Sequence, residues 1–429
     1  MSFQKQESSQ LGNAGRVNSA ILLILAAFAV QSASAQESIR PSSTGSTAAD
    51  ARQQTETDGV YNVKLGPVGV NVTGSMEIEG TDNVGLTQTN RQGDLILTPG
   101  IQFDSQWKVT ELNSLHLNLG LDYSKYLEHS NLSTRSVLLA PGSQIAFNMY
   151  LGGFVRLTFH DQFAILQNPV DEPTLSNVAR FDRFQNSAGL TALVDLNDLK
   201  LVLGYDHFDF RSLDSQFDTL NRNEEQSFAS ASLTLSDAVT AGVDGSFALV
   251  NYLVNYNNNG TTWTAGPFVE ATLSPYTKLR LSGGYQSMHF DGNGTSGDLT
   301  NLGGWYGSLS AAQRLNQYWS HSLTLGREAR LGLDVNFTEY TYARYQASWR
   351  VNTRMNAGFE AFYENADQSG TALQDSENSH RLGGGFSLSW KLGNKLALSL
   401  RYQYVKKVSD LDLRSYYQNV GTLTLHYDF

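Results

Sequence analysis

The sequence lacks cysteine altogether and contains only 8 prolines among 429 residues. The absence of cysteine excludes disulfide frameworks and thiolate chemistry. It fits an oxidising compartment such as the periplasm, although many cytosolic proteins also lack cysteine. No apolar run after Val30 is long enough to form a membrane-spanning helix. The formal charge of −11 argues against nucleic acid as a partner.

The N-terminus has the pattern of a secretory signal peptide. Lys5 and Arg16 precede an apolar run from Ala20 to Val30, and small residues follow up to Ala35. We therefore expect residues 1–35 to be removed on export. Residues 36–58 are rich in Ser, Thr, Gln and Ala without an apolar period, which predicts a flexible periplasmic leader.

Most of the remaining chain alternates apolar and polar residues in segments of strand length. With 20 Tyr, 21 Phe and 38 Gly, its composition suits twisted antiparallel strands rather than helices. Charged residues fall almost entirely on the polar face of these segments. An apolar outer face with a polar inner face is typical of a membrane β-barrel, whereas soluble sandwiches seldom have so many long consecutive strands of this kind. Two clear examples are the runs Leu115, Leu117, Leu119, Leu121 and Leu396, Leu398, Leu400, Tyr402.

The lengths of the connections support the same interpretation. Eight short turns alternate with nine longer, polar links that are rich in Gly and Asn. Outer-membrane barrels have tight periplasmic turns and longer external loops. The sequence therefore predicts an all-β fold over residues 59–429: a transmembrane, up-and-down antiparallel barrel of eighteen strands, with sixteen as the alternative.

The last strand ends in an aromatic residue. Leu423, Leu425, Tyr427 and Phe429 alternate up to the C-terminus. This pattern resembles the C-terminal insertion signal of outer-membrane barrels, which the barrel-assembly machinery recognises. The alternative is an ordinary closing strand of a soluble β protein.

Taken together, the chain resembles the β-barrel porin families of Gram-negative outer membranes, especially the second β-barrel porin family. The resemblance rests on the signal peptide, the leader, Leu65-Gly66-Pro67-Val68 and Thr81-Asp82-Asn83-Val84, and it covers residues 60–429. It implies an outer-membrane channel or a structural barrel, and it carries over no catalytic residue.

Three periplasmic turns are preceded by an indole followed by a cation. Trp107, Trp349 and Trp390 are each followed by Lys or Arg. We expect the indoles to form an interface girdle at the lipid headgroups, with the cations reaching for phosphate. Chance reuse of a good turn sequence is the alternative.

The strand phases predict which charged residues face the lumen, and the two signs nearly balance. A mixed lining either orients polar solutes or consists of ion pairs that hold the wall together. Arg344 and Glu360 lie nearly opposite each other on neighbouring strands, which favours a structural pair. The predicted pore-lining residues are Lys108, Arg156, Lys200, Arg280, Arg344, Arg350, Arg401, Asp104, Asp122, Asp206, Asp244, Glu270 and Glu360.

No motif predicts a catalytic, cofactor or metal site. His129-Ser130-Asn131 departs from the spacing of outer-membrane phospholipases, so we interpret it as a polar loop. Residues 292–297 match a dinucleotide fingerprint formally but have no helix behind them, so we expect a turn. The flanking Asp291 and Asp298 offer at most weak calcium ligands.

These observations favour a porin through which small polar solutes diffuse passively. The alternative is a non-conducting structural or docking barrel, for example one associated with export of envelope polysaccharide. The expected partners are outer-membrane lipid, the assembly machinery and small polar solutes; no oligomeric state is indicated. The predicted external loop 166–183, which holds Pro169, Pro173, Arg180, Asp182 and Arg183, is a candidate constriction.

Overall fold

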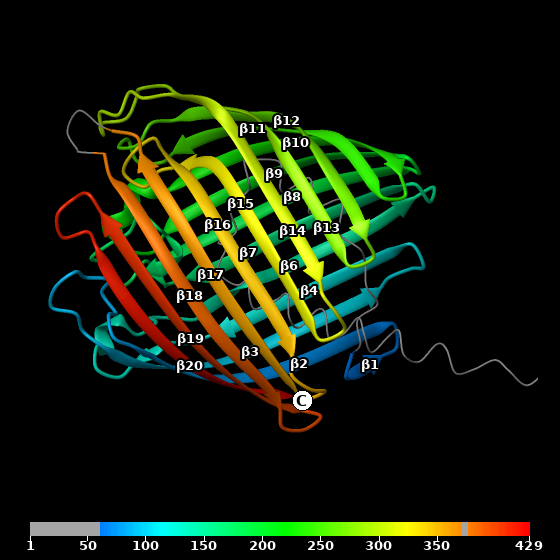
Figure 1. Ribbon diagram of the computed structural model, residues 1–429, viewed down its shortest axis with the longest axis horizontal. Coiled ribbons are helices and arrows are strands. Elements are labelled where there is room, and N and C mark those ends of the chain that lie inside the picture. The colour runs from blue at the N-terminus through cyan, green and yellow to red at the C-terminus, as the bar shows by residue number, and fades with distance from the viewer. Residues whose placement is uncertain (1–60, 371–375) are drawn as a thin grey trace, which may run out of the picture. The chain divides into compact units, whose positions relative to one another are not determined.

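The computed structural model describes residues 61–370 and 376–429, and these form a closed antiparallel β-barrel of eighteen strands (Figure 1). Each strand pairs with its neighbour in sequence, and the last strand pairs with the first. The predicted fold class and strand number are confirmed. The predicted signal peptide and leader lie outside the described residues.

The barrel strands are 10 to 15 residues long. They are β2 (Val68–Thr81), β3 (Asp94–Lys108), β4 (Asn113–Asp122), β6 (Leu138–Leu151), β7 (Val155–Leu166), β8 (Arg183–Leu196), β9 (Leu199–Ser212), β10 (Arg222–Ser236), β11 (Val239–Tyr252), β12 (Gly260–Ser274), β13 (Thr277–Phe290), β14 (Leu302–Arg314), β15 (Trp319–Leu331), β16 (Phe337–Arg350), β17 (Met355–Gln368), β18 (Asn378–Lys391), β19 (Leu396–Ser409) and β20 (Tyr416–Asp428).

Two short strands accompany the barrel. β1 (Val63–Leu65) forms a tight hairpin with the start of β2, and Gly66 at its tip has a positive φ of 63°. Glycine adopts this conformation without steric cost. β5 (Lys125–Tyr126) pairs with β3 beyond the end of β4.

Side-chain exposure follows the alternation of the sequence. On β9, Leu203 is 60% exposed and Tyr205 is 48% exposed, whereas Val202 and Asp206 are buried. The outward side chains are apolar and the inward ones are mainly polar, as a lipid exterior and a hydrated interior require. The described residues contain no helix that is long and apolar enough to cross a membrane.

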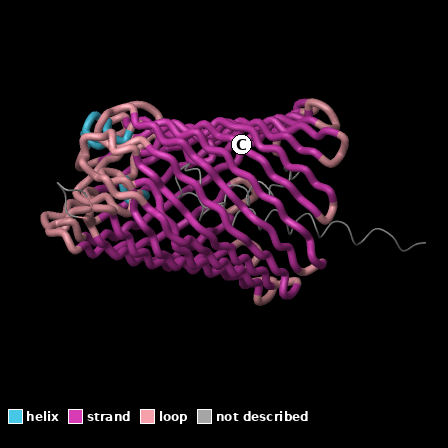
Figure 2. Tube along the Cα trace, turned by 90° about the horizontal axis from the view of Figure 1, so that it is seen from above, coloured by secondary structure: helices cyan, strands magenta, loops and turns pink. Residues whose placement is uncertain are grey.

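The connections have the predicted asymmetry. Eight turns of two to four residues lie at one end of the barrel, and nine longer loops gather at the other (Figure 2). The last of these longer loops is short, and covers only residues 410–415. Strand pairing continues past the point where outward residues become polar, so the end of an apolar face does not mark the end of a strand.

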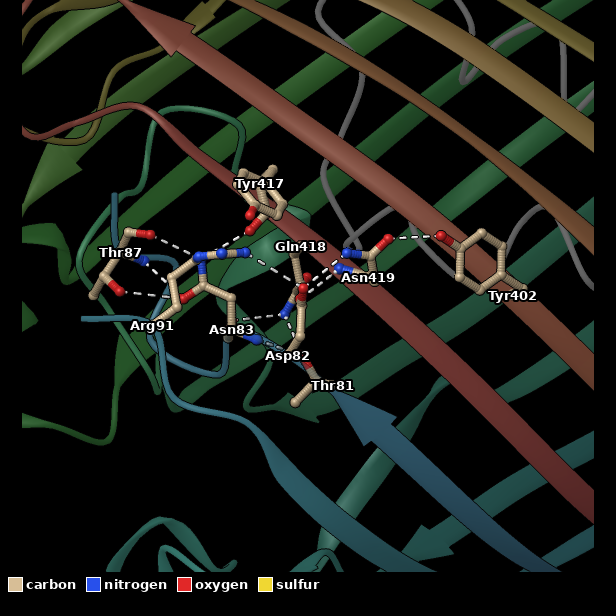
Figure 3. A network of polar contacts seen from close by, with 9 residues as sticks. All are labelled: Thr81, Asp82, Asn83, Thr87, Arg91, Tyr402, Tyr417, Gln418 and Asn419. Atoms are coloured by element: carbon tan, nitrogen blue, oxygen red, sulfur yellow. Dashed lines mark hydrogen bonds and ion pairs between the residues drawn. The ribbon is translucent and has the colours of Figure 1, made fainter. Parts of the chain in front are cut away.

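The barrel closes between β2 and β20, and a polar network joins these strands at the loop end (Figure 3). The buried Asn83 amide donates to the carbonyl oxygens of Thr87 and Tyr417, at 2.8 Å each. Asp82 accepts hydrogen bonds from the backbone and the side chain of Asn419, at 2.7 and 2.8 Å. The Asp82-Asn83 segment therefore ties the first strand to the last.

Candidate functional site

The inner face of the barrel is the candidate site. Strand alternation places all thirteen predicted pore-lining residues on this face, opposite outward hydrophobics. Arg156, for example, lies opposite Leu193, which packs inside the barrel against Val202 and Phe228. Alternation alone accounts for this placement, because neighbouring residues of a strand point to opposite faces.

Several of these residues form ion pairs with one another. Arg280 contacts both Asp244, at 3.2 Å, and Glu270. Arg401 contacts Glu360 at 2.7 Å. These pairs join strands β11 to β13 and β17 to β19, so part of the charged lining stabilises the wall.

The expected pairing of Arg344 with Glu360 needs correction. The register places Arg344 opposite Phe362, and its guanidinium contacts Glu364 at 3.0 Å. Glu364 also contacts Arg381 at 2.7 Å. The partner lies four residues closer to the loops than the expected Glu360, and two residues beyond Phe362, because side chains of this length reach diagonally across strands.

Histidine and lysine pairs complete the lining. His160 contacts Asp206 at 2.7 Å, with Gly189 of the strand between them. A Cβ atom at Gly189 would lie 2.0 Å from the Asp206 carboxylate, so only glycine permits this approach. Lys200 contacts Asp195 at 2.8 Å.

Sequence reasoning missed two inward carboxylates on β2. Met76 and Ile78 are outward and exposed, so Glu77, which lies between them, and Glu79, which follows Ile78, face the lumen. Asp122 of β4 lies beside them. Its neighbour on β3 is Gly100, which in turn pairs with Ser75 of β2, and the missing side chain of Gly100 leaves room for the Asp122 carboxylate. The alternation of Val68, Val70, Val72, Met76 and Ile78 was the signal that could have identified this face.

The β7–β8 loop, residues 167–182, crosses to strands on another part of the wall. Arg381 of β18 donates to the carbonyl oxygen of Val170 at 2.8 Å, and Lys407 of β19 donates to that of Thr174 at 2.9 Å. Ser176 donates to the carbonyl oxygen of Arg414 at 2.7 Å. The loop therefore folds into the barrel, as a constriction requires.

Buried charges anchor this loop. Lys407 and Glu377 form an ion pair at 2.9 Å, and both side chains are almost completely buried. Arg414 approaches Glu377 at 3.3 Å. Arg183, the first residue of β8, contacts Asp171 near the start of the loop at 3.4 Å. Burial raises the pKa of Asp171 to about 6, although the Arg183 charge opposes this shift.

An apolar cluster lies beneath the loop. Leu175 and Phe181 of the loop pack with Phe208, Phe210 and Leu220, and with Leu333 of the β15–β16 loop. Pro169 is buried, and Arg180 pairs with Asp182. Hydrophobic contacts therefore join the β7–β8 loop to a loop from a distant hairpin.

Asp298 connects four external loops. Its carboxylate accepts hydrogen bonds from the backbone of Asn336, at 2.9 Å, and from the hydroxyl of Ser369, at 2.8 Å. Its backbone carbonyl accepts from the side chain of Asn258 at 2.6 Å. The suggestion that Asp298 and Asp291 bind calcium is not supported, because structural hydrogen bonds occupy the Asp298 carboxylate. The described residues contain no group of three or more His, Cys, Asp or Glu side chains that could hold a metal ion.

His129 is also occupied by structural contacts. Its Nδ1 lies 2.8 Å from Asp94 and its Nε2 lies 3.0 Å from Gln92. Ser130 begins a 3₁₀ turn that continues to Leu132. Because both ring nitrogens have partners, the arrangement gives Ser130 no activating base.

The three girdle tryptophans point outward and are 43% to 46% exposed. The cations that follow them, Lys108, Arg350 and Lys391, lie on the inner face. The idea that indole and cation reach the same lipid headgroups is therefore wrong, because consecutive strand residues face opposite sides. Leu423, Leu425, Tyr427 and Phe429 are outward, with the rings of Tyr427 and Phe429 in an edge-to-face contact.

Comparisons with known proteins agree with this geometry. A family model described as "OmpA-like transmembrane domain" matches residues 277–429. A BenF-like porin from Pseudomonas fluorescens Pf-5 has a similar structure, with a TM-score of 0.51 and 11% identity over 85% of this chain and 100% of that chain. OccK2 (OpdF) from Pseudomonas aeruginosa, solved with glucuronate, has a TM-score of 0.50 and 12% identity over 84% of this chain and 98% of that chain.

The fold is that of an outer-membrane porin. A comparison with curated proteins found no match. At these identities the likeness concerns the fold, and the solute of the similar porin is not transferred to this chain. The structure and the comparisons together describe a porin-like outer-membrane barrel.

Proposed function

We propose that this barrel allows small polar solutes to diffuse passively through an aqueous lumen. The observation that carries the proposal is the closed ring of eighteen strands with polar and charged residues on its inner face. Barrels of sixteen to eighteen strands are wide enough to enclose a water-filled channel. Those of the thirteen predicted lining residues that are not buried in ion pairs would then be in contact with the permeating solute.

Hydroxyl groups on the inner wall support this proposal. The hydroxyl oxygens of Ser282 and Ser308 lie 2.9 Å apart on neighbouring strands of the inner face, and both residues are partly exposed. Hydroxyls donate and accept hydrogen bonds without carrying charge, so they replace part of the hydration of a polar solute regardless of its charge.

Planar-bilayer recording of the purified, refolded protein tests the proposal. Steady open-channel steps would support it, and liposome swelling with uncharged sugars would show whether the pore admits solutes as well as ions. Silence in both assays would contradict it.

One observation favours a non-conducting docking barrel instead. The external loops bond to one another, with the Asn258, Asn336 and Ser369 contacts centred on Asp298 and the β7–β8 loop bound to the opposite wall. A mouth held shut in this way would suit a barrel that binds a partner rather than one that conducts. The same bilayer recording distinguishes the two functions.

The proposal includes a route to the membrane. Residues 1–35 would direct export, and Tyr427 and Phe429 would be recognised by the barrel-assembly machinery in the outer membrane of a Gram-negative-type bacterium. The outward position of both rings leaves them accessible for this recognition. Trp107, Trp349 and Trp390 would lie at the periplasmic lipid interface.

A further inference from the structure

Basic residues gather on the inner face where the strands meet the short turns. Each lies within two residues of a strand end, and together they come from seven strands spread around the barrel. Lys108, Arg350 and Lys391 follow outward tryptophans, so they face inward. The full set, here called the basic ring, is Lys108, Arg156, Lys200, Lys278, Arg314, Arg350 and Lys391. The same end of the inner face carries two carboxylates, Asp195, which contacts Lys200 at 2.8 Å, and Asp428.

The opposite end of the barrel is acidic. The described residues of the nine longer loops contain thirteen Asp and Glu side chains against five Lys and Arg side chains. The short turns are nearly neutral, with three acidic and two basic side chains. The two mouths therefore have opposite charge, although the chain as a whole is acidic.

The inner wall continues this separation. Glu77 and Glu79 lie near the loop end of β2, and Asp122 is the last residue of β4. Within the described residues, none of these three carboxylates has an ion pair, whereas the inward arginines at the same end of the barrel, such as Arg344 and Arg381, contact Glu364. The wall between β2 and β4 thus places three carboxyl groups, without an arginine or lysine partner among the described residues, at the loop end of the lumen.

We infer that the barrel is a bipolar pore, negative at its external end and positive at its periplasmic end, and that it rectifies ionic current. This inference rests on the proposed function, because it requires a conducting lumen. Fixed charge of one sign concentrates counter-ions in its own zone. When the external side is positive, cations enter through the acidic zone and anions through the basic ring, so both accumulate in the lumen and the current rises. The opposite voltage depletes both.

Bilayer recordings over a range of salt concentrations test this inference. The zones act at a distance only while the Debye length is comparable to the pore radius. The Debye length is about 10 Å at about 0.1 M salt and about 3 Å at about 1 M. We expect currents at equal and opposite voltages to differ by about twofold or more at the lower salt and to become nearly equal at the higher salt. The wild-type protein suffices for this measurement.

Charge variants then assign the effect to the basic ring. Replacing Lys278 and Arg350 together with glutamate should abolish rectification and increase the preference for cations, read from the reversal potential in a salt gradient. A double variant with glutamine should reduce rectification without reversing the charge of the ring. Lys406→Glu is the matched control, because Lys406 is exposed on the outer face of β19.

The outcomes separate the two claims. Open-channel steps with equal currents at all salt concentrations would overturn the bipolar pore and leave passive diffusion standing. Rectification that survives in both double variants would overturn the role of the basic ring. A silent protein would overturn the proposed function and the bipolar pore with it.

Discussion

Lys407 is the anchor of the β7–β8 loop, and removing its charge should release that loop. In Lys407→Met the side chain keeps its length and loses the ammonium group. The ammonium contacts Glu377 and the Thr174 carbonyl oxygen at 2.9 Å each, and Ser176 at 3.1 Å. The substitution would leave the Glu377 carboxylate without its main partner. Because Glu377 is buried, water cannot replace that partner.

The size of the effect follows from this burial. Breaking a buried ion pair by removing one partner costs about 3–5 kcal/mol. Arg414 stays 3.3 Å from Glu377 and compensates in part, so we expect the lower limit, about 3 kcal/mol. Since about 1.4 kcal/mol is tenfold in an equilibrium, the open state of the loop should become about a hundredfold more populated.

Two measurements report this change. Limited proteolysis should cut within residues 167–182 much faster in Lys407→Met, and single-channel conductance should increase or fluctuate more. Glu377→Gln should act in the same direction, and the double variant should lose less than the sum of the two. Lys406→Met, on the outer face, is the control.

Unchanged proteolysis and conductance in both single variants would refute the reasoning. That result would mean that the apolar cluster under the loop holds it without the ion pair. Heat-modifiable gel mobility should be similar in all variants, because the barrel strands keep their own pairing.

Four further predictions follow from other parts of the barrel. Leu119→Arg should impair folding into bilayers by about 2–4 kcal/mol while Asn118→Arg is tolerated, since arginine on the lipid face is costly; equal effects would mean that the strand phase is inverted. Deletion of Phe429 should reduce outer-membrane insertion but not export, and unchanged insertion at low expression would contradict an assembly signal. Asn83→Ala should lower the free energy of unfolding by about 1–3 kcal/mol, because it leaves buried carbonyl groups at the β2–β20 seam unpaired; urea denaturation of the refolded barrel measures it. Burial raises the pKa of Asp171 to about 6, so its ionisation destabilises the closed loop as pH rises from about 4 through 6; the loop should be cut more slowly at pH 5 than at pH 7, and Asp171→Asn should remove the difference.

The barrel itself was predictable because its information is local. Alternation along each strand specifies which face meets lipid, and a pair such as Leu398 and Ser399 identifies the face without any knowledge of the neighbours. The number of strands followed from the regular exchange of short turns and long loops. Both the alternation and the connection lengths can be recognised in a single sequence.

The interior contacts were less predictable because they depend on distant parts of the chain. Nothing around Thr174 indicates that its carbonyl oxygen will meet Lys407. Register shows which strands face each other, but the partner of Arg344 depended on a diagonal reach to Glu364. On β2, Gly74 interrupts the apolar alternation and obscured the inward phase of Glu77 and Glu79.

The network around Asp298 determines how the loop end of this barrel would be recognised by a binding protein. Its partners come from three other loops that are far apart in sequence, so the exposed surface is assembled from several segments at once. Antibodies raised against any single loop as a linear peptide would meet a shape that the folded protein does not present. Antibodies raised against the intact barrel, conversely, would lose their epitope when one of these loops is replaced.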